Sequence, residues 1–359
     1  MKLDLKKNCK YGVAVPTSMG VRITPPNGAP VNTSNYYYMQ ATSAESNAVN
    51  ISSALGIKGL VLTNFVKDSP ISYFIKSELR RRNIDFYGPD IPQGGPWGYR
   101  HQFNIVDSGF GNRGPRVHND RAGEVGCVLN SKDFDFDRIF GEDGVQILHL
   151  SGLVGALSAD TTKFCIKAVH AAKKHGTLIS FDLNHRASFW AGREEQLRKD
   201  FIEMVSLTDI LIGNEEDYQL SLGIEGPQEG GRDLSVQIDD FKEMVVRIKK
   251  VFPNASVFGN TLRQVVTTNE HEWGALTLFG DTWTIVEPRT IQVLDRIGGG
   301  DGFSGGLLYG ILKEMTPEKA TQFAWASGVL ATTVLEDYAM PADEEVVWSI
   351  YSGNARVKR

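Results

Sequence analysis

The 359-residue sequence predicts an α/β fold: one domain in which helices cover a parallel sheet, with a small β lid added near the N-terminus. Three features lead to this prediction. Short apolar runs alternate with helical periods over the C-terminal two-thirds of the chain. Polar residues follow the ends of those runs, and the N-terminal third has a different, strand-rich texture.

The C-terminal two-thirds predicts repeated βα units. Amphipathic helical patterns cover residues 161–174 and 239–250. Around them stand four apolar runs of strand length, at 145–150, 177–182, 209–214 and 255–259. Consecutive βα units form a parallel sheet with helices on its faces.

Polar residues stand where these strands are expected to end. Asp182 closes one apolar run, with Asn184 and Arg186 just beyond it, and Asn214 closes the next. A turn of three glycines followed by Asp301 comes later in the chain. Because ligands of open α/β sheets bind at the C-terminal ends of the strands, we expect these residues to share one site.

The N-terminal third predicts the lid. Residues 99–106 and 115–122 flank a turn-rich stretch and suggest an antiparallel hairpin, while helical patterns cover 43–55 and 69–82. We expect the lid to come from about residues 17–40 and 91–125. The sequence has no internal repeat and no linker, so residues 1–359 are expected to form a single domain.

Composition and charge exclude several other classes of protein. Lys and Arg number 38 against 43 Asp and Glu, a net charge of −5, so the basic excess of a nucleic-acid-binding protein is missing. Cys9, Cys127 and Cys165 form no closely spaced pair, which argues against a disulfide framework and a zinc site. The N-terminus lacks the apolar core of a signal peptide, and no run is long enough to span a bilayer. We therefore expect a cytoplasmic protein that acts on small molecules, without nucleic-acid or membrane partners.

The glycine turn at 298–300 is the strongest local signal. Successive glycines at a strand-to-helix junction let backbone N–H groups point into one concavity, where the helix start adds partial positive charge. Phosphoryl transfer needs such an anion site together with a base for the acceptor hydroxyl. We expect the amides of Gly298, Gly299 and Gly300 to hold the transferring group and Asp301 to accept the proton.

Other glycine-rich turns that bind phosphates differ from this one. A dinucleotide-binding fold would need glycine where Phe303 stands, and a P-loop would need a Gly-Lys-Ser/Thr sequence that is absent. A purely structural role, in which Asp301 only caps the following helix, fits the isolated motif about as well.

Four further segments accompany the turn at 295–303. They are Phe-Asp-Leu-Asn-His-Arg at 181–186, Gly-Asn-Glu-Glu-Asp at 213–217, Thr-Leu-Arg at 261–263 with Trp-Gly-Ala at 273–275, and Phe-Ala-Trp-Ala-Ser-Gly at 323–328. Together these segments resemble the ribokinase-like, phosphofructokinase-B-type family of carbohydrate kinases, and most of all its 2-keto-3-deoxygluconate kinases. The resemblance extends over nearly the whole chain.

The resemblance implies a ribokinase-like three-layer α/β/α domain with a mostly parallel sheet, and transfer of the γ-phosphoryl group of ATP to a sugar acid. On the nucleotide side it implies roles for Asn214, Asp217, Thr261, Arg263 and Ser327. Asp217, one methylene shorter than the family's glutamate, would act on Mg²⁺ indirectly. On the acceptor side it implies Arg186 for the carboxylate, with Asn47, Arg121, Asn119, Thr42 and Ser43 around the sugar. A K⁺ site with Asp295 as a ligand and a dimer formed through the lid sheets are further implications.

The sequence departs from the family pattern mainly in the sugar half. Thr42-Ser43 replaces a Gly-Gly pair, and Asn119 replaces a lid tyrosine. A sugar acid such as 2-keto-3-deoxygluconate is the leading acceptor. The alternatives are a neutral sugar of the fructose or ribose type, and a homologue that senses sugar without transferring phosphate.

Overall fold

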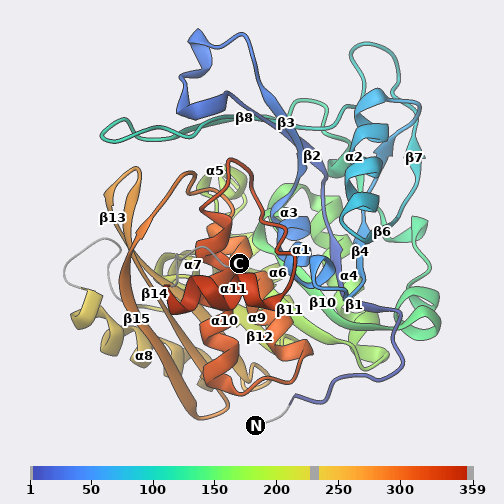
Figure 1. Ribbon diagram of the computed structural model, residues 1–359. Helices are drawn as coiled ribbons and strands as arrows, with labels where there is room; N and C mark the ends of the chain where they lie inside the picture. Colours follow the sequence, from blue (N-terminus) through green and yellow to red (C-terminus); the bar gives the residue numbers. More distant parts are fainter. Residues whose placement is uncertain (1–2, 227–233, 354–359) are drawn as a thin grey trace.

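A nine-stranded sheet forms the centre of the computed structural model, which describes residues 3–226 and 234–353 (Figure 1). Seven neighbouring strands run parallel, and two antiparallel strands complete one edge. In spatial order the strands are β15 (Thr282–Gln292), β14 (Glu270–Phe279), β13 (Val257–Thr267), β12 (Ile210–Ile212), β11 (Leu178–Asp182), β10 (Val145–Ser151), β1 (Tyr11–Pro16), β4 (Gly59–Leu62) and β6 (Ile84–Tyr87).

Helices cover both faces of this sheet. One face carries α1 (Ala44–Ala54), α2 (Pro70–Arg81), α9 (Gly299–Leu312), α10 (Pro317–Ala331) and α11 (Glu344–Ser352), and the other carries α3 (Gly152–Leu157), α4 (Ala159–Lys174), α6 (Glu194–Ser206), α7 (Glu215–Leu222) and α8 (Leu234–Val251). Neighbouring strand residues alternate between the two cores, as Ile147 and Leu148 do in β10. This alternation follows from the two-residue period of a strand, and it explains why the buried strands are apolar throughout.

The predicted three-layer α/β fold is confirmed. The four strands and the helices expected in the C-terminal two-thirds are present, with ends that differ by a few residues. The short run expected at 255–259 is the start of the much longer β13, which continues into an antiparallel sheet with β14 and β15. In the exposed half of this antiparallel sheet polar residues interrupt the apolar ones, so the sequence does not reveal how long the strands are.

A second, four-stranded sheet lies over the C-terminal ends of the central strands, at the top of Figure 1. Its order is β3 (Tyr38–Thr42), β2 (Gly20–Thr24), β8 (Phe103–Asp107) and β9 (Arg116–Asp120), and we call it the small sheet. The expected hairpin is present as β8 and β9. A two-stranded pairing of β5 (Phe65–Val66) with β7 (Asp90–Ile91) lies beside it.

The two faces of the small sheet differ in polarity. Pairing across the strands sets Gln40, Arg22, Asn104 and Asn119 in one row. The adjacent row holds Met39, Ile23, Ile105 and His118, whose side chains point the opposite way because successive residues of a strand alternate. The polar row faces the central sheet, so the space between the sheets has a polar roof.

Among the described residues, no helix is both long and apolar enough to cross a membrane.

Candidate active site

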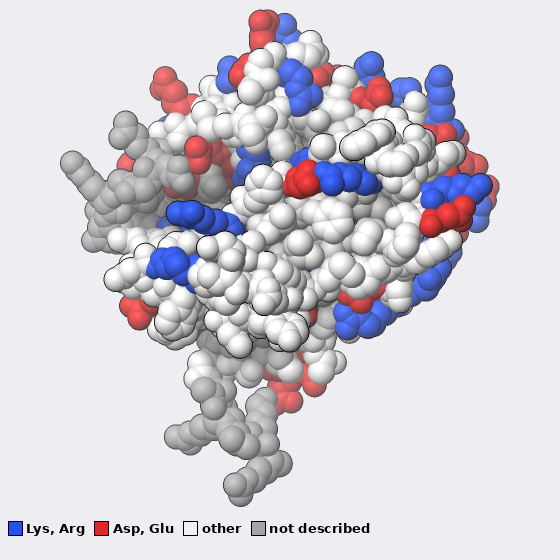
Figure 2. Space-filling model, turned by 90° about the horizontal axis from the view of Figure 1, so that it is seen from above, with Lys and Arg blue, Asp and Glu red and all other residues white. Residues whose placement is uncertain are grey.

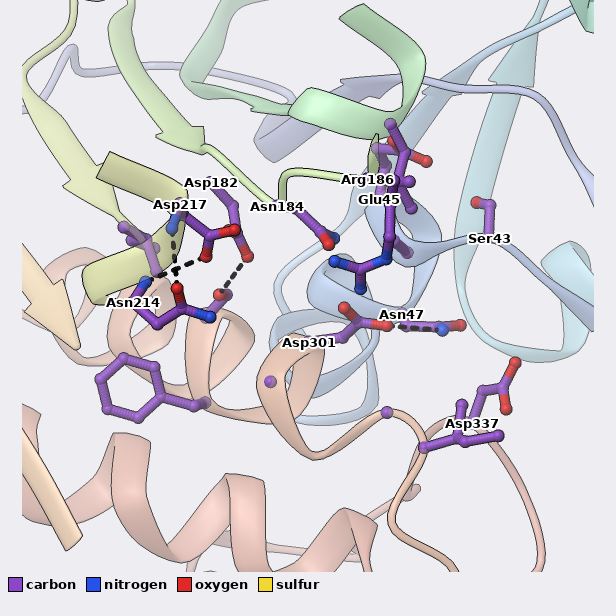
Figure 3. Close-up of a pocket in the computed structure, with 18 of the residues that line it drawn as sticks. Ser43, Glu45, Asn47, Asp182, Asn184, Arg186, Asn214, Asp217, Asp301 and Asp337 are labelled. Atoms are coloured by element: carbon purple, nitrogen blue, oxygen red, sulfur yellow. Dashed lines mark hydrogen bonds between the residues drawn. The ribbon is translucent and has the colours of Figure 1, made fainter. Parts of the chain in front are cut away.

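A cavity of about 1010 Å³ lies between the small sheet, the C-terminal ends of the central strands and the start of α9 (Figure 3). Most of the residues expected at the site line it, although they come from distant parts of the chain. They are Thr42, Ser43, Asn47, Asn119, Arg121, Arg186, Asn214, Asp217, Thr261, Arg263, Gly298, Gly300 and Asp301.

The glycine turn forms the floor of the cavity. Gly298 has φ of 84°, and a Cβ there would lie 1.8 Å from the carbonyl oxygen of Asp337, so only glycine is tolerated. A Cβ on Gly300 would meet no atom within 4 Å, which means that this residue faces open space. Residues 299–301 form the first turn of α9, where N–H groups have no acceptor within the helix. The turn therefore offers free backbone donors and the helix dipole to an anion.

Asp301 stands at this helix start and points into the cavity beside Asn47 (Figure 3). Asn47 Nδ2 donates to Asp301 Oδ2 over 2.9 Å. Burial raises the pKa of Asp301 well above its usual range, the hydrogen bond from Asn47 opposes this shift, and the charges of Asp182, Asp337 and Glu45 add to it. A carboxylate with a raised pKa is a stronger base, which suits proton abstraction.

Asp182 and Asp217 form a second carboxylate group in the cavity (Figure 3). Burial raises the pKa of Asp182 to about 7, with a further contribution from the charge of Asp217. Burial also raises the pKa of Asp217. Ser304 Oγ donates to Asp182 Oδ2 over 3.2 Å and partly offsets the effect on Asp182. Two buried carboxylates at one end of a cavity are an oxygen-rich site for a positive charge.

Asn214 and Asp217 also shape the backbone. They form a capping box at the start of α7, in which Asn214 Oδ1 accepts from the Asp217 N–H over 2.8 Å and Asp217 Oδ2 accepts from the Asn214 N–H over 3.0 Å. Asp217 Oδ1 accepts from the His185 N–H over 2.7 Å. Asp217 thus ties the start of α7 to the loop that carries Arg186.

The two arginines expected at the acceptor side differ in their partners. Arg121 donates to both carboxylate oxygens of Glu124, at 2.7 and 2.9 Å, and stacks on Phe189. Arg186 Nη1 donates to the carbonyl of His185 over 2.7 Å, and no described carboxylate forms a salt bridge with it. In Figure 3 its guanidinium points into the cavity, on the side of Asn47 and Asp301. Arg186 is therefore available for an anionic ligand, whereas the charge of Arg121 is already compensated.

Amide side chains from the small sheet and the residue before its strand β8 complete the acceptor side. Gln102, Asn104 and Asn119 line the cavity. Within the described part of the chain, Gln102 Oε1 and Asn104 Oδ1 are buried without a hydrogen-bond partner. Buried polar atoms are normally paired, so these oxygens are suited to accept hydrogen bonds from a ligand with several hydroxyl groups.

Comparison with known proteins assigns the chain to a family. The model of the pfkB family of carbohydrate kinases matches residues 143–343, which is more than half of the chain. The chain belongs to the pfkB family of carbohydrate kinases. It is therefore a sugar kinase, a phosphotransferase, as its sequence predicts.

Two named relatives of this pfkB-family kinase act on sugar acids by name. It is 25% identical over 343 residues to a 2-dehydro-3-deoxygalactonokinase from Haloferax volcanii, a match that covers 94% of this chain and 96% of the other. It is 26% identical over 228 residues to a 5-dehydro-2-deoxygluconokinase from Clostridium tetani, covering 63% of this chain and 60% of the other.

Solved structures confirm the ribokinase-like fold of this pfkB-family kinase. The 2-dehydro-3-deoxygluconokinase of Thermotoga maritima superposes with a TM-score of 0.85 at 24% identity, covering 96% of this chain and 98% of the other. A protein from E. coli assigned as a ribokinase II and solved with ATP and Mg²⁺ superposes with a TM-score of 0.75 at 17% identity, covering 96% of this chain and all of the other.

Three of the expected residues of this pfkB-family kinase do not line the cavity. Gly299 packs behind the turn, where a Cβ would lie 2.2 Å from the ring of Trp273. Ser327 is fully buried between α9 and α10, where a Cβ on Gly306 would lie 2.6 Å from its Oγ. Asp295 is buried next to the turn, and its carboxylate accepts hydrogen bonds from Arg22, Ser108 Oγ and the Ile297 N–H.

Thr42 and Ser43 line the cavity but use their hydroxyl groups within the protein. Thr42 Oγ1 donates to Asp337 Oδ2 over 2.6 Å, and Ser43 Oγ accepts from the Ser46 N–H over 3.1 Å at the start of α1. Thr42 and Ser43 therefore form part of the cavity wall.

The structure adds residues that the sequence did not single out. Glu45, Arg296 and Asp337 line the cavity. Asp182 also lines it, as expected for a polar residue at a strand end, although the sequence assigned it no role of its own. Its position at a strand end was a usable signal, because such residues face the ligand crevice. Arg296 belongs to the turn segment at 295–303 and Glu45 stands between Ser43 and Asn47, so of these three residues only Asp337 lies outside the segments that the sequence marked.

Proposed function

We propose that this chain transfers the γ-phosphoryl group of ATP to a hydroxyl of a keto-deoxy sugar acid, with 2-keto-3-deoxygluconate as the leading acceptor. The observation that carries the proposal is the position of Arg186. Its guanidinium forms no salt bridge with a described carboxylate, although it acts electrostatically on Asp182 and Asp217, and it points into the cavity that holds Asp301 and a row of amide side chains. Arginine binds a planar carboxylate through two parallel hydrogen bonds, and the amides suit hydroxyl groups.

Asp301 is the proposed base. It would accept the proton of the acceptor hydroxyl as that oxygen attacks the γ-phosphorus of ATP and the bond to the ADP oxygen breaks. Asn47 fixes the orientation of the carboxylate, since it donates to Oδ2 over 2.9 Å and leaves Oδ1 free to face the acceptor. The free N–H groups of residues 299–301 would stabilise the charge of the transferring group, a contribution that in enzymes is often about 10²–10³-fold.

The nucleotide would lie on the side of the cavity formed by Asn214, Thr261 and Arg263. The E. coli structure solved with ATP and Mg²⁺ shares this fold, which supports ATP as the phosphoryl donor. Arg296, at the mouth of the glycine turn, adds positive charge near the expected phosphates.

Asp182 and Asp217 fit an ATP-bound Mg²⁺. Both carboxyl groups are buried with raised pKa values, so a cation between them and the phosphates would be favoured. Each oxygen of Asp217 already accepts a backbone N–H, which favours contact through water, as Mg²⁺ commonly makes with protein carboxylates. When bound, Mg²⁺ would neutralise charge on the phosphates of ATP. The described residues hold no group of three or more His, Cys, Asp or Glu side chains that would bind a metal by itself.

The deciding experiment measures ADP formation with Mg²⁺-ATP across a panel of acceptors. The panel contains 2-keto-3-deoxygluconate, 2-keto-3-deoxygalactonate, 5-keto-2-deoxygluconate, fructose and ribose, with a reaction without sugar as the baseline. We expect turnover with a keto-deoxy acid. Turnover with neutral sugars alone would contradict the acid assignment, and sugar-dependent thermal stabilisation without ADP formation would indicate a sugar sensor.

A pair of variants tests the role of Arg186. Arg186→Gln removes the unpaired charge, so KM for the acid should rise about 10²-fold while KM for ATP changes little. Arg121→Gln is the matched control from the same cavity. It leaves Glu124 buried without its partner, so its main expected effect is a lower melting temperature. An equal effect of Arg186→Gln on acidic and neutral acceptors would argue against carboxylate binding.

We also propose that two chains associate through the outer face of the small sheet. This face carries the apolar row of Met39, Ile23 and Ile105, with exposed Tyr36 and Tyr37 beside it. Figure 2, which views the molecule from this side, shows uncharged residues across much of the surface, with a positive residue beside a negative one near its middle and further charged residues around them.

We also infer a cytoplasmic location. Cys9, Cys127 and Cys165 are well separated and form no disulfide, which suits the reducing cytoplasm, where ATP is available.

A further inference from the structure

A buried arginine lies beside the glycine turn and outside the proposed catalytic groups. Arg22, from β2 of the small sheet, has a side chain that is only 1% exposed. It donates through Nη2 to Asp295 and through Nη1 to Asp337, and both carboxylates are also largely buried. Burial opposes the charge of Arg22, but the two carboxylates outweigh it and raise the pKa of the guanidinium. Arg22 is therefore a permanently charged cation at this place.

This ion triad connects directly to the anion-binding turn. Asp295 Oδ1 accepts from the Ile297 N–H over 3.0 Å, and so fixes the residue that enters the turn. The backbone carbonyl of Asp337 packs against Gly298, where a Cβ would lie only 1.8 Å away. The Asp337 N–H donates to Gln40 Oε1 over 2.9 Å, and its Oδ2 accepts from Thr42 Oγ1. Arg22 thereby joins the small sheet, the turn and the 337 loop.

The family resemblance implies a K⁺ ion at this turn, but the oxygen atoms around Asp295 do not fit one, because hydrogen bonds already occupy them. Asp295 Oδ2 already accepts from Arg22 and from Ser108 Oγ, the latter over 2.6 Å, and its Oδ1 is used by the backbone. Both carboxylate oxygens of Asp337 also have donors. A second cation placed against these oxygens would lie close to the guanidinium, and repulsion between like charges is strong where water is excluded.

We propose that the guanidinium of Arg22 takes the place of a monovalent cation beside the glycine turn. This chain then transfers phosphate without K⁺, and Arg22 acts as a positioning residue that holds residues 297–300 in their anion-binding shape. The inference rests on the proposed phosphoryl transfer for its activity readout. Its stability readout does not depend on that function.

The wild-type protein provides the first test. Turnover and thermal unfolding are measured in potassium chloride and in tetramethylammonium chloride at equal ionic strength. We expect turnover to agree within about twofold between the two salts, and the melting temperature to be the same. Activation of about tenfold or more by K⁺, or stabilisation by K⁺ alone, would overturn the proposal. A protein that forms no ADP in either salt would disprove the kinase assignment, while the melting curves would still decide the cation question.

Variants provide the second test. Arg22→Ala should lower kcat about 10²-fold in tetramethylammonium chloride, and added guanidinium or K⁺ should restore part of it. Arg22→Lys keeps a cation in place, so it should retain most of the turnover and provides the folded variant if Arg22→Ala does not fold. Arg113→Ala is the matched control, because Arg113 lies in the loop between β8 and β9 and pairs with Asp107, outside the triad of Arg22, Asp295 and Asp337. Losses in Arg22→Ala that no cation relieves, with a melting temperature lowered as in Arg113→Ala, would overturn the positioning role.

Discussion

At the scale of single residues, the cavity brings several carboxyl groups together, and their burial lowers the free energy of unfolding at neutral pH. Burial raises the pKa of Glu45, Asp182, Asp217 and Asp301. A carboxyl whose pKa is raised in the folded protein binds its proton more tightly there than in the unfolded chain. The free energy of unfolding therefore falls as pH rises from the unfolded pKa to the folded one, and the loss persists above it.

Asp301→Asn tests both the proposed role of Asp301 as the base and the destabilising effect of its buried charge. The amide cannot accept the proton, so kcat should fall by about 10²–10⁴-fold. The oxygen of the new amide can still accept the hydrogen bond from Asn47, and the substitution removes a buried charge, so the melting temperature at neutral pH should rise. Asp281→Asn, at an exposed position, is the control and should leave turnover unchanged. Wild-type turnover in Asp301→Asn would exclude Asp301 as the base.

Asp182→Asn tests the pH dependence. Because the pKa of Asp182 rises to about 7 on folding, wild type should lose stability relative to the variant between about pH 4 and pH 7. The difference in unfolding free energy should be small at pH 4, grow up to about pH 7 and then level off. Chemical denaturation across this range measures it. A difference that is constant with pH would mean that Asp182 titrates normally in the folded protein.

At the scale of elements, the glycine turn combines a structural and a binding requirement in adjacent residues. Gly298 needs glycine for its backbone, since its φ is positive and the carbonyl of Asp337 fills the Cβ position. Gly300 has room for a side chain, but that room is the cavity itself. The same motif therefore contains one glycine required by the fold and one required by the ligand.

Two substitutions separate these requirements. Gly298→Ala should destabilise the protein by roughly 1–3 kcal/mol, because it forces a strained backbone and a clash. Gly300→Ala should melt at or slightly above the wild-type temperature, since alanine favours the helix, yet lower kcat/KM for ATP about 10²-fold. Thermal unfolding and initial rates on both variants test this. Loss of stability in Gly300→Ala would mean that the position is not open.

At the scale of the whole molecule, the small sheet separates two environments. Its inner row is polar and faces the cavity, while its outer row is apolar and partly exposed. An exposed apolar sheet face commonly marks an interaction surface. Closure of this sheet over bound substrates would also exclude water and limit the hydrolysis of ATP.

Met39→Glu tests the proposed dimer. Met39 is 44% exposed on the outer row, so a charge there should leave the fold intact and shift the protein from dimer toward monomer. Light scattering coupled to gel filtration measures the mass. Val251→Glu, at the exposed end of α8, is the control and should not change it. A wild-type protein that is monomeric at all concentrations would contradict the proposal.

The agreement between sequence and structure is best where signals are local. Ser43 and Asn214 are residue types that favour the N-cap of a helix, and each caps a helix in the structure, α1 and α7 respectively. The glycine turn and the loop of Arg186 are continuous motifs, and both reach the cavity. Ser327 was expected on the nucleotide side from a similar segment, but packing against α9 buries it.

The sequence by itself determined the fold class and the residues at strand ends and helix starts, because hydrophobic period, capping and turn chemistry act over a few neighbouring positions. The carbohydrate kinase family was expected from the resemblance of several separated segments to that family. Only the tertiary structure decided which charged groups meet. Arg22 and Asp337 are 315 positions apart, and Arg22 and Asp295 are 273 positions apart. Burial and charge pairing depend on contacts between distant segments, and those contacts exist only once the chain has folded.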